Sequence, residues 1–151
     1  TEDQCLWTKK AYGDFTLDLE FRTAAGTNSG VIVYCSDANN WIPNSVEIQI
    51  ADDFAEQWAK SPKTWQCGAI FGHLAPTKSV VKKPGRWNRF TIKCVDKQID
   101  VALNGDGQRQ ETRSQATERG EPLAGGTLEK LIAAAQRLHV FVLRIAAAKG
   151  A

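Results

Sequence analysis

The sequence predicts an all-β protein built as an antiparallel β-sandwich. Runs of alternating apolar and polar residues recur through the first two-thirds of the chain, and a period of two is typical of strands with one buried face. Turn residues separate these runs and no helical pattern lies between them, which argues against an α/β fold. A chain of 151 residues has the length of one domain, so we expect residues 1–151 to form a single sandwich.

The first strands follow one another from residue 14. "DFTLDLEFR" (14–22) alternates throughout, and "VIVYCS" (31–36) follows the turn-forming stretch "AAGTNSG". "SVEIQI" (45–50) places its three aliphatic side chains on one face, so Glu47 and Gln49 stand side by side on the other, about 7 Å apart.

The middle of the chain contains an irregular excursion and then a hairpin. "DDFAEQWAKSPKTW" (52–65) matches no period, and "CGAIFG" (67–72) resumes extended structure. "RWNRFTIKCV" (86–95) and "QIDVAL" (98–103) are expected to pair around a tight turn. "NGDG" (104–107) then supplies a further hairpin signal, because Asn-Gly favours the turns that join antiparallel strands.

The C-terminal third has a different pattern. Residues 106–126 are polar and lack periodicity, so we expect a long loop. "TLEKLIAAAQRL" has apolar residues at helical spacing after Thr127, a suitable N-cap, which predicts a short helix near 127–137. "HVFVLRI" (139–145) alternates weakly and is expected to form a last strand.

Composition excludes some classes of function. The net charge is only +2, which argues against a dedicated nucleic-acid surface. No run of 18 apolar residues exists, so we expect no membrane span. The oligomeric state is left open by the sequence.

The four cysteines are widely spaced and include no CxxC pair, which disfavours a structural zinc site. In strand register, Cys35 and Cys94 are both expected to face the core. Buried thiols are one interpretation of the four residues. One or two disulfides in an oxidising compartment are the alternative.

Six segments in fixed order resemble a known family. They are "YGDFTLDLEFR", "TNSGVIVY", "VEIQIADD", "CGAIFGHLAP", "KKPGRWNRFTIKC" and "VALNG", and the match to which they belong runs over about residues 6–105. Their order and spacing are similar to those of the 3-keto-disaccharide hydrolase domain family, formerly a domain of unknown function. The resemblance implies a concanavalin A-like jelly roll whose curved sheet forms a concave sugar groove.

The chain departs from the family pattern at both ends. The family opens with a strand upstream of the point where this chain begins. Its C-terminal "GLQ…HG" segment is replaced here by "LIAAAQRLHVFVLRI". His139 is therefore the one candidate for the family's C-terminal histidine.

The resemblance implies that Glu47 and Gln49 point into the sugar groove, with Glu47 as a catalytic base and Gln49 as a substrate contact. A solvated strand face is the alternative for both. His73, in "FGHLAP", is the second catalytic candidate, as proton shuttle, carbonyl donor or metal ligand, or else it is a surface residue. A divalent metal ion beside Glu47 is a further candidate, with unknown ligands.

Four more residues are candidate substrate contacts, each with a structural alternative. Tyr34 is expected on the face opposite Val33, and Trp41 has an aromatic face suited to stacking on a sugar. Asn28 and Asp52 can either contact a sugar at the rim of the groove or serve as turn residues.

The family acts on sugars that carry a ketone at carbon 3. The resemblance therefore implies cleavage of 3-keto-glycosides by C2 proton abstraction, elimination and rehydration, in the periplasm or outside the cell. A non-catalytic carbohydrate-binding module of the same fold is the first alternative. A structural or assembly protein is the second.

Overall fold

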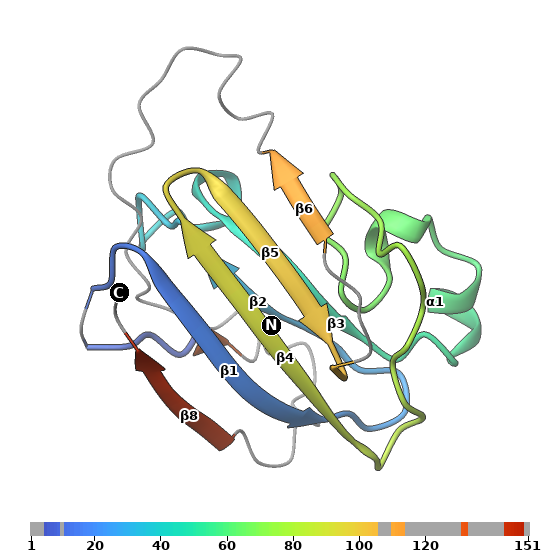
Figure 1. Cartoon of the computed structure of the whole chain (residues 1–151). Helices are drawn as coiled ribbons and strands as arrows, with labels where there is room; N and C mark the ends of the chain where they lie inside the picture. The colour runs from blue at the N-terminus through green and yellow to red at the C-terminus, as the bar shows by residue number, and fades with distance from the viewer. Residues whose placement is uncertain (1–4, 10, 106–109, 114–130, 133–143, 150–151) are drawn as a thin grey trace.

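The computed structural model describes residues 5–9, 11–105, 110–113, 131–132 and 144–149. In this part of the chain the strands form two antiparallel sheets that pack face to face, as the sequence predicts (Figure 1). The larger sheet has five strands in the order β6-β5-β4-β1-β8, and the smaller has three in the order β3-β2-β7. The larger sheet comprises β1 (Phe15–Arg22), β4 (Trp87–Val95), β5 (Gln98–Leu103), β6 (Gln110–Arg113) and β8 (Arg144–Lys149). The smaller comprises β2 (Asn28–Val33), β3 (Val46–Ala51) and β7 (Leu131–Ile132).

The larger sheet follows the alternation of its sequence closely. In β1 every second residue is buried, and β4 has the same period, so the apolar residues of both strands face the smaller sheet. Their register pairs Leu19 with Phe90, and the rings of Phe21 and Phe90 lie 4.9 Å apart between centroids. This packed layer fixes the platform on which the smaller sheet rests.

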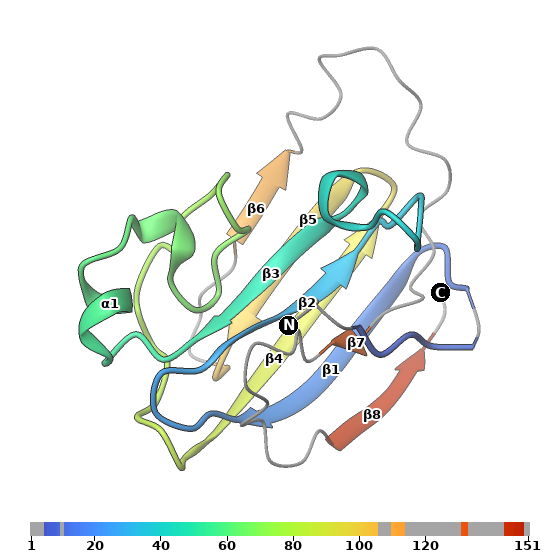
Figure 2. The same ribbon diagram turned by 180° about the vertical axis from the view of Figure 1, so that it is seen from behind.

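Strands β2 and β3 of the smaller sheet are largely buried on both faces. Val31, Val33, Ile48 and Ile50 belong to the core between the sheets. Their neighbours point the other way, onto a surface that we call the outer face, and several of these are buried as well. Figure 2 shows this sheet in front of the larger one.

Strand β2 ends at Val33, earlier than predicted, because Tyr34 has a φ of 51°. This left-handed residue breaks the alternation of the strand. Tyr34 therefore packs against the core between the sheets, whereas Cys35 lies with Ile32 on the outer face. The expectation that Cys35 faces the core with Val33 is corrected by this single backbone feature.

The excursion predicted at 52–65 contains two short helical turns, α1 (Glu56–Ala59) and η2 (Lys63–Trp65), and a 3-10 turn, η1 (Ile42–Asn44), precedes β3. Figure 1 shows α1 beyond the β3 edge of the sandwich. The predicted Asn-Gly turn after β5 is confirmed, since Asn104 and Gly105 have φ values of 60° and 72°.

The C-terminal predictions are corrected in part. The expected loop at 106–126 contains a strand, because Gln110–Arg113 pairs with β5 as β6. The expected helix near 127–137 has two described residues, Leu131 and Ile132, and these pair with β2 as β7. The predicted last strand (139–145) overlaps β8 at its final two residues, and residues 139–143, His139 among them, lie outside the described part of the chain.

The four cysteines are thiols in the structure, and three of them are buried while Cys5 is half-buried. Burial raises the pKa of Cys67, and it raises the pKa of Cys94 to about 12. Within the described ranges, no helix is long and apolar enough to cross a membrane.

Candidate functional site

Glu47 stands in the middle of a row of three side chains on the outer face. The register of β2 and β3 places Ile32 directly opposite Glu47. On the other edge of β3, Ile48 bridges Ile70, and the Phe71 N–H donates to the Glu47 carbonyl at 2.9 Å. Directly opposed residues of an antiparallel pair share a face, so Phe71 emerges beside Glu47 while Ile48 and Ile70 point into the core. The row therefore puts one carboxylate between two apolar side chains.

Gly30 makes room for the Glu47 side chain. A Cβ atom at position 30 would lie 2.7 Å from Glu47 Cγ and 2.8 Å from Cδ, and closer still to Oε1. The carboxylate therefore lies over the bare backbone of β2 rather than extending freely into solvent. Glu47 is half-buried in this position.

Gln49 and Asn28 form a partly buried hydrogen bond next to this carboxylate. Gln49 Nε2 donates to Asn28 Oδ1 at 3.1 Å, and Gln49 is 0% exposed. The proposed role of Gln49 as a substrate contact does not fit this burial, because a ligand cannot reach the side chain as it stands. The geometry instead assigns Gln49 a positioning role between β2 and β3, while Asn28 is exposed at the end of the same face.

The two aspartates after β3 shape the loops. Asp52 is buried, and its carboxylate accepts hydrogen bonds from the Gly26 and Phe54 N–H groups. It is therefore a turn residue rather than a substrate contact. Asp53 accepts from the Cys67 N–H at 2.8 Å, and desolvation by burial raises the pKa of its carboxyl group.

His73 is exposed in the turn that follows Phe71. Its backbone N–H donates to the Ile70 carbonyl, and the Leu74 N–H donates to the same atom. The Phe71 N–H donates a hydrogen bond to the Glu47 carbonyl, so the turn that carries His73 begins beside the candidate base. His73 therefore lies in an exposed turn that begins next to the backbone of Glu47.

The two aromatic residues predicted to contact substrate are both packed against neighbouring side chains. Tyr34 packs at the core edge, its hydroxyl donates to the Gln98 carbonyl, and burial raises its pKa. Trp41 packs with Cys5 and Trp7 against Ile32 and Cys35, which supports the loop-anchoring alternative. Tyr34 is thus directed away from the outer face, whereas Trp41 packs on Ile32, the residue opposite Glu47, and its contact with substrate stays a prediction.

The side chains around Glu47 do not fit a metal centre. Among the described residues, no group of three or more His, Cys, Asp or Glu side chains is arranged to hold a metal ion. The neighbours of Glu47 in its row are Ile32 and Phe71, and the nearby amides of Asn28 and Gln49 bond each other. We therefore assign no step of the chemistry to a metal.

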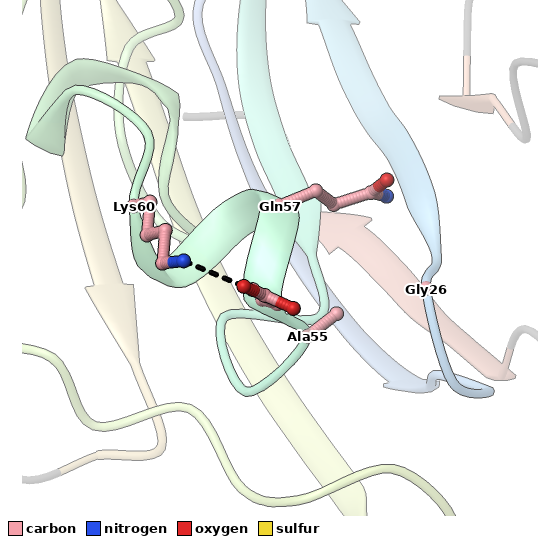
Figure 3. A pocket seen from close by; sticks show the side chains of 5 residues that line it. Gly26, Ala55, Gln57 and Lys60 are labelled. Carbon is pink, nitrogen blue, oxygen red and sulfur yellow. Dashed lines mark hydrogen bonds and ion pairs between the residues drawn. The ribbon is translucent and has the colours of Figure 1, made fainter.

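A hollow of about 500 Å³ lies beyond the far end of β3. Gly26 and the exposed side of α1 line it, and Gln57 extends from α1 across the hollow toward β2 (Figure 3). Lys60 pairs with Glu56 on the same helical turn. This hollow does not include Glu47, and it is shallow, so we place the candidate site at the Glu47 row instead.

Two residues that the sequence left unassigned complete the surroundings of Glu47. Phe71 stands next to it, and the ring of Trp65 stacks on Phe71 with centroids 5.5 Å apart. The alternation in "CGAIFG" carried a signal for Phe71, since an inward Ile70 turns the next residue outward. Trp65 lies in an irregular turn, where no period places a side chain.

The comparisons with known proteins identify the family. The sequence matches the 3-keto-alpha-glucoside-1,2-lyase-like domain over residues 1–133. The chain belongs to this family. The predicted resemblance is thereby confirmed, and the match extends through β7. A comparison of this lyase-like domain with curated proteins finds no match.

Solved structures share the fold of this lyase-like domain. A crystal structure of a "putative glycosyl hydrolase" from Parabacteroides distasonis ATCC 8503 is 52% identical, with a TM-score of 0.70, and the match covers 74% of this chain and 57% of that one. Two further proteins of the same description and organism are 20% and 21% identical, with TM-scores of 0.64 and 0.52. The matches cover 74% and 70% of this chain but 55% and 48% of theirs, and at this identity they show the fold alone.

Proposed function

We propose that this domain cleaves 3-keto-glycosides and that Glu47 is the base that removes the proton on carbon 2. The observation that carries the proposal is the position of Glu47. It is a carboxylate on the outer face of the smaller sheet, folded over Gly30 and flanked by Ile32 and Phe71. Membership of the 3-keto-alpha-glucoside-1,2-lyase-like family supports the choice of substrate.

The chemistry follows from the ketone at carbon 3. This ketone acidifies the C2 hydrogen, so a carboxylate can take the proton and leave an enediolate. The C1–O bond then breaks, its electron pair leaves with the glycosidic oxygen, and that oxygen takes a proton. Water adds across the new C1=C2 bond, with hydroxide on carbon 1 and a proton on carbon 2. The net result is hydrolysis, and no oxidant or reductant is needed.

The apolar neighbours of Glu47 suit a base that attacks a carbon acid. A carboxylate is a weak base toward C–H, and polar donors aimed at the enediolate oxygen must supply the rest of the driving force. His73 is the candidate donor, because its turn begins at Phe71 and its side chain is exposed. The Gln49–Asn28 hydrogen bond holds the two strands beneath the carboxylate in register.

Isotope incorporation tests the reaction. Direct displacement at carbon 1 leaves the C2 hydrogen in place, whereas elimination followed by rehydration exchanges it with solvent. We expect the 3-keto sugar released in D₂O from a 3-keto-α-glucoside to carry deuterium at carbon 2 at the first turnover. Because free 3-keto sugars exchange slowly on their own, the product incubated without protein is the control. Release of sugar with hydrogen retained at carbon 2 would reject the elimination route.

A non-catalytic carbohydrate-binding module is the second candidate. Its supporting observation is the burial of Gln49, the side chain next to Glu47 on β3. A buried amide cannot contact a ligand, and a two-carboxylate hydrolase would need a second acidic side chain at this distance. Such a module would bind an unmodified glycan and release no product. Binding without turnover of any 3-keto-glycoside would favour it over the enzyme.

A further inference from the structure

Trp65, which is exposed, and Phe71, which is half-buried, form an aromatic pair that core packing does not account for. Neither ring belongs to the two hydrophobic clusters of the protein, and Trp65 is 41% exposed. Their rings stack at an interplanar angle of 29°, and the Gly72 N–H donates to the Thr64 carbonyl, which ties the two chain segments together. We call this pair the aromatic shelf.

The aromatic shelf lies directly beside the candidate base. The Phe71 N–H donates to the Glu47 carbonyl, so the two residues lie on adjacent chain segments, and adjacent strands of a sheet are about 4.8 Å apart. That spacing is comparable to the width of one pyranose ring. Because the carboxylate is directed toward Gly30 on β2, a sugar ring that touches both the carboxylate and the shelf has to lie across β3.

The stereochemistry of a glucoside determines which face of the ring would lie there. In the usual chair of a glucosyl ring, the C2 and C4 hydrogens are axial on the same face. A base that removes the C2 hydrogen from this face brings the C4 hydrogen toward whatever lies next to the base. In the C4 epimer, a galactoside, an axial hydroxyl takes the place of that hydrogen. An aromatic face accepts C–H groups and leaves a hydroxyl without a partner.

We infer that the aromatic shelf binds the C2–C4 face of the 3-keto-glucosyl ring and selects the gluco over the galacto configuration at carbon 4. The inference rests on the proposed function, because it takes Glu47 as the group that meets the C2 hydrogen. Trp87 makes a contrast within the same chain. It is 36% exposed, but the Arg22 guanidinium lies 5.4 Å from its ring centroid on the larger sheet.

Calorimetric titration of a variant that does not consume its ligand tests the shelf. Four proteins are compared: Glu47→Gln alone, and Glu47→Gln combined with Trp65→Ala, with Trp65→Phe or with Trp87→Ala. Each is titrated with methyl 3-keto-α-glucoside and, separately, with its C4 epimer. We expect the glucoside to bind more tightly than the epimer. Trp65→Ala should weaken glucoside binding about three- to tenfold and bring the two affinities together. Trp65→Phe, which keeps a flat ring, should retain the preference, and Trp87→Ala should change neither affinity.

The outcomes separate the shelf from the reaction. An unchanged glucoside preference in Trp65→Ala, an equal effect of Trp87→Ala, or failure of the Glu47→Gln protein to bind either sugar would overturn the shelf. Thermal unfolding of each variant shows that the fold is retained, and Trp65 is exposed enough for its removal to be tolerated. If the variants show the expected binding pattern but the sugar released by the unsubstituted protein in D₂O carries no deuterium at carbon 2, the proposed reaction is rejected and the shelf is retained.

Discussion

The side chain of Glu47 lies over the backbone of Gly30, its diagonal neighbour on the adjacent strand. An added Cβ at position 30 would come within 2.8 Å of both Glu47 Cγ and Cδ. Cγ is close to the backbone and cannot swing away without a change of rotamer at Glu47. The orientation of the candidate base therefore depends on a glycine whose own φ is ordinary for any residue.

Gly30→Ala should displace the Glu47 carboxylate and reduce turnover of a 3-keto-glucoside by at least about tenfold, because small misplacements of a catalytic group are costly. Gly13→Ala is the matched control, since nothing lies within 4 Å of a Cβ there. Steady-state kinetics and thermal unfolding of both variants provide the measurement. Equal activity of Gly30→Ala and Gly13→Ala would show that the carboxylate has no need of this position.

Removal of the buried amide should cost stability. Gln49→Ala removes the hydrogen bond to Asn28 Oδ1 and opens space in a fully buried site, so we expect a loss of about 1–3 kcal/mol in the free energy of unfolding. Gln57→Ala, on the exposed side of α1, should lie within about 0.5 kcal/mol of the parent. Urea unfolding measures both. A Gln49→Ala protein as stable as the Gln57→Ala protein would contradict the positioning role.

Asp53 should make the protein less stable as the pH rises. Burial raises the pKa of this carboxyl group above its ordinary 3.8, so the folded state holds the proton more tightly than the unfolded state does. The free energy of unfolding therefore falls as the pH rises from about the ordinary value through the raised one. Asp53→Asn removes this fall and keeps an oxygen for the Cys67 N–H. Urea unfolding from pH 3 to 7 should show the variant gaining on the parent as the pH rises, and parallel profiles would refute the assignment.

Asp18 should show the opposite slope in the same measurement. Its hydrogen bond with Arg89, from Nε to Oδ1 at 2.6 Å, lowers the pKa of the Asp18 carboxyl group. The stability that this pair contributes is present above the ordinary pKa and is lost as the pH falls through the lowered one. The pair is largely exposed, so the effect should be small and should shrink in high salt. A profile of Asp18→Asn that lies below the parent equally at every pH would contradict this.

The two core thiols should resist alkylation in the folded protein. Burial raises the pKa of Cys67 and of Cys94, the latter to about 12, and the thiolate is the reactive form. At pH 8 we expect iodoacetamide to modify neither residue before the protein unfolds, and both in urea. Peptide mass spectrometry identifies the modified sites. Rapid native labelling of Cys94 would show that the space between the sheets is open to solvent.

The positions of most strands along the chain could be predicted because these strands are amphipathic. In β1 each inward residue is apolar and each outward one is polar, so the period of two fixes both the strand and its face. Tyr34 shows the limit of this reasoning. The side-chain pattern does not predict its left-handed backbone, which ends β2 early. As a result, Tyr34 and Cys35 each lie on the opposite face from the one predicted.

The candidate site was predicted only in part, because alternation gives a face but not its surroundings. Glu47 lies on the expected face, yet Gln49 beside it is fully buried, since strands β2 and β3 are largely buried on both faces. Phe71 reaches Glu47 through a bridge between segments 22 residues apart, and Trp65 joins it from an irregular turn. Contacts of this kind depend on tertiary packing, which the local sequence pattern does not encode.

Turnover of a 3-keto-α-glucoside by the Glu47→Gln protein is the decisive measurement for the proposed base. Glutamine keeps the size of the side chain over Gly30 but cannot accept the C2 proton, and loss of a general base typically costs 10²–10⁴-fold. We therefore expect kcat to fall at least about a hundredfold, with the unfolding temperature close to that of the parent. A Glu47→Gln protein that turns over substrate within about twofold of the parent would show that another group removes the proton.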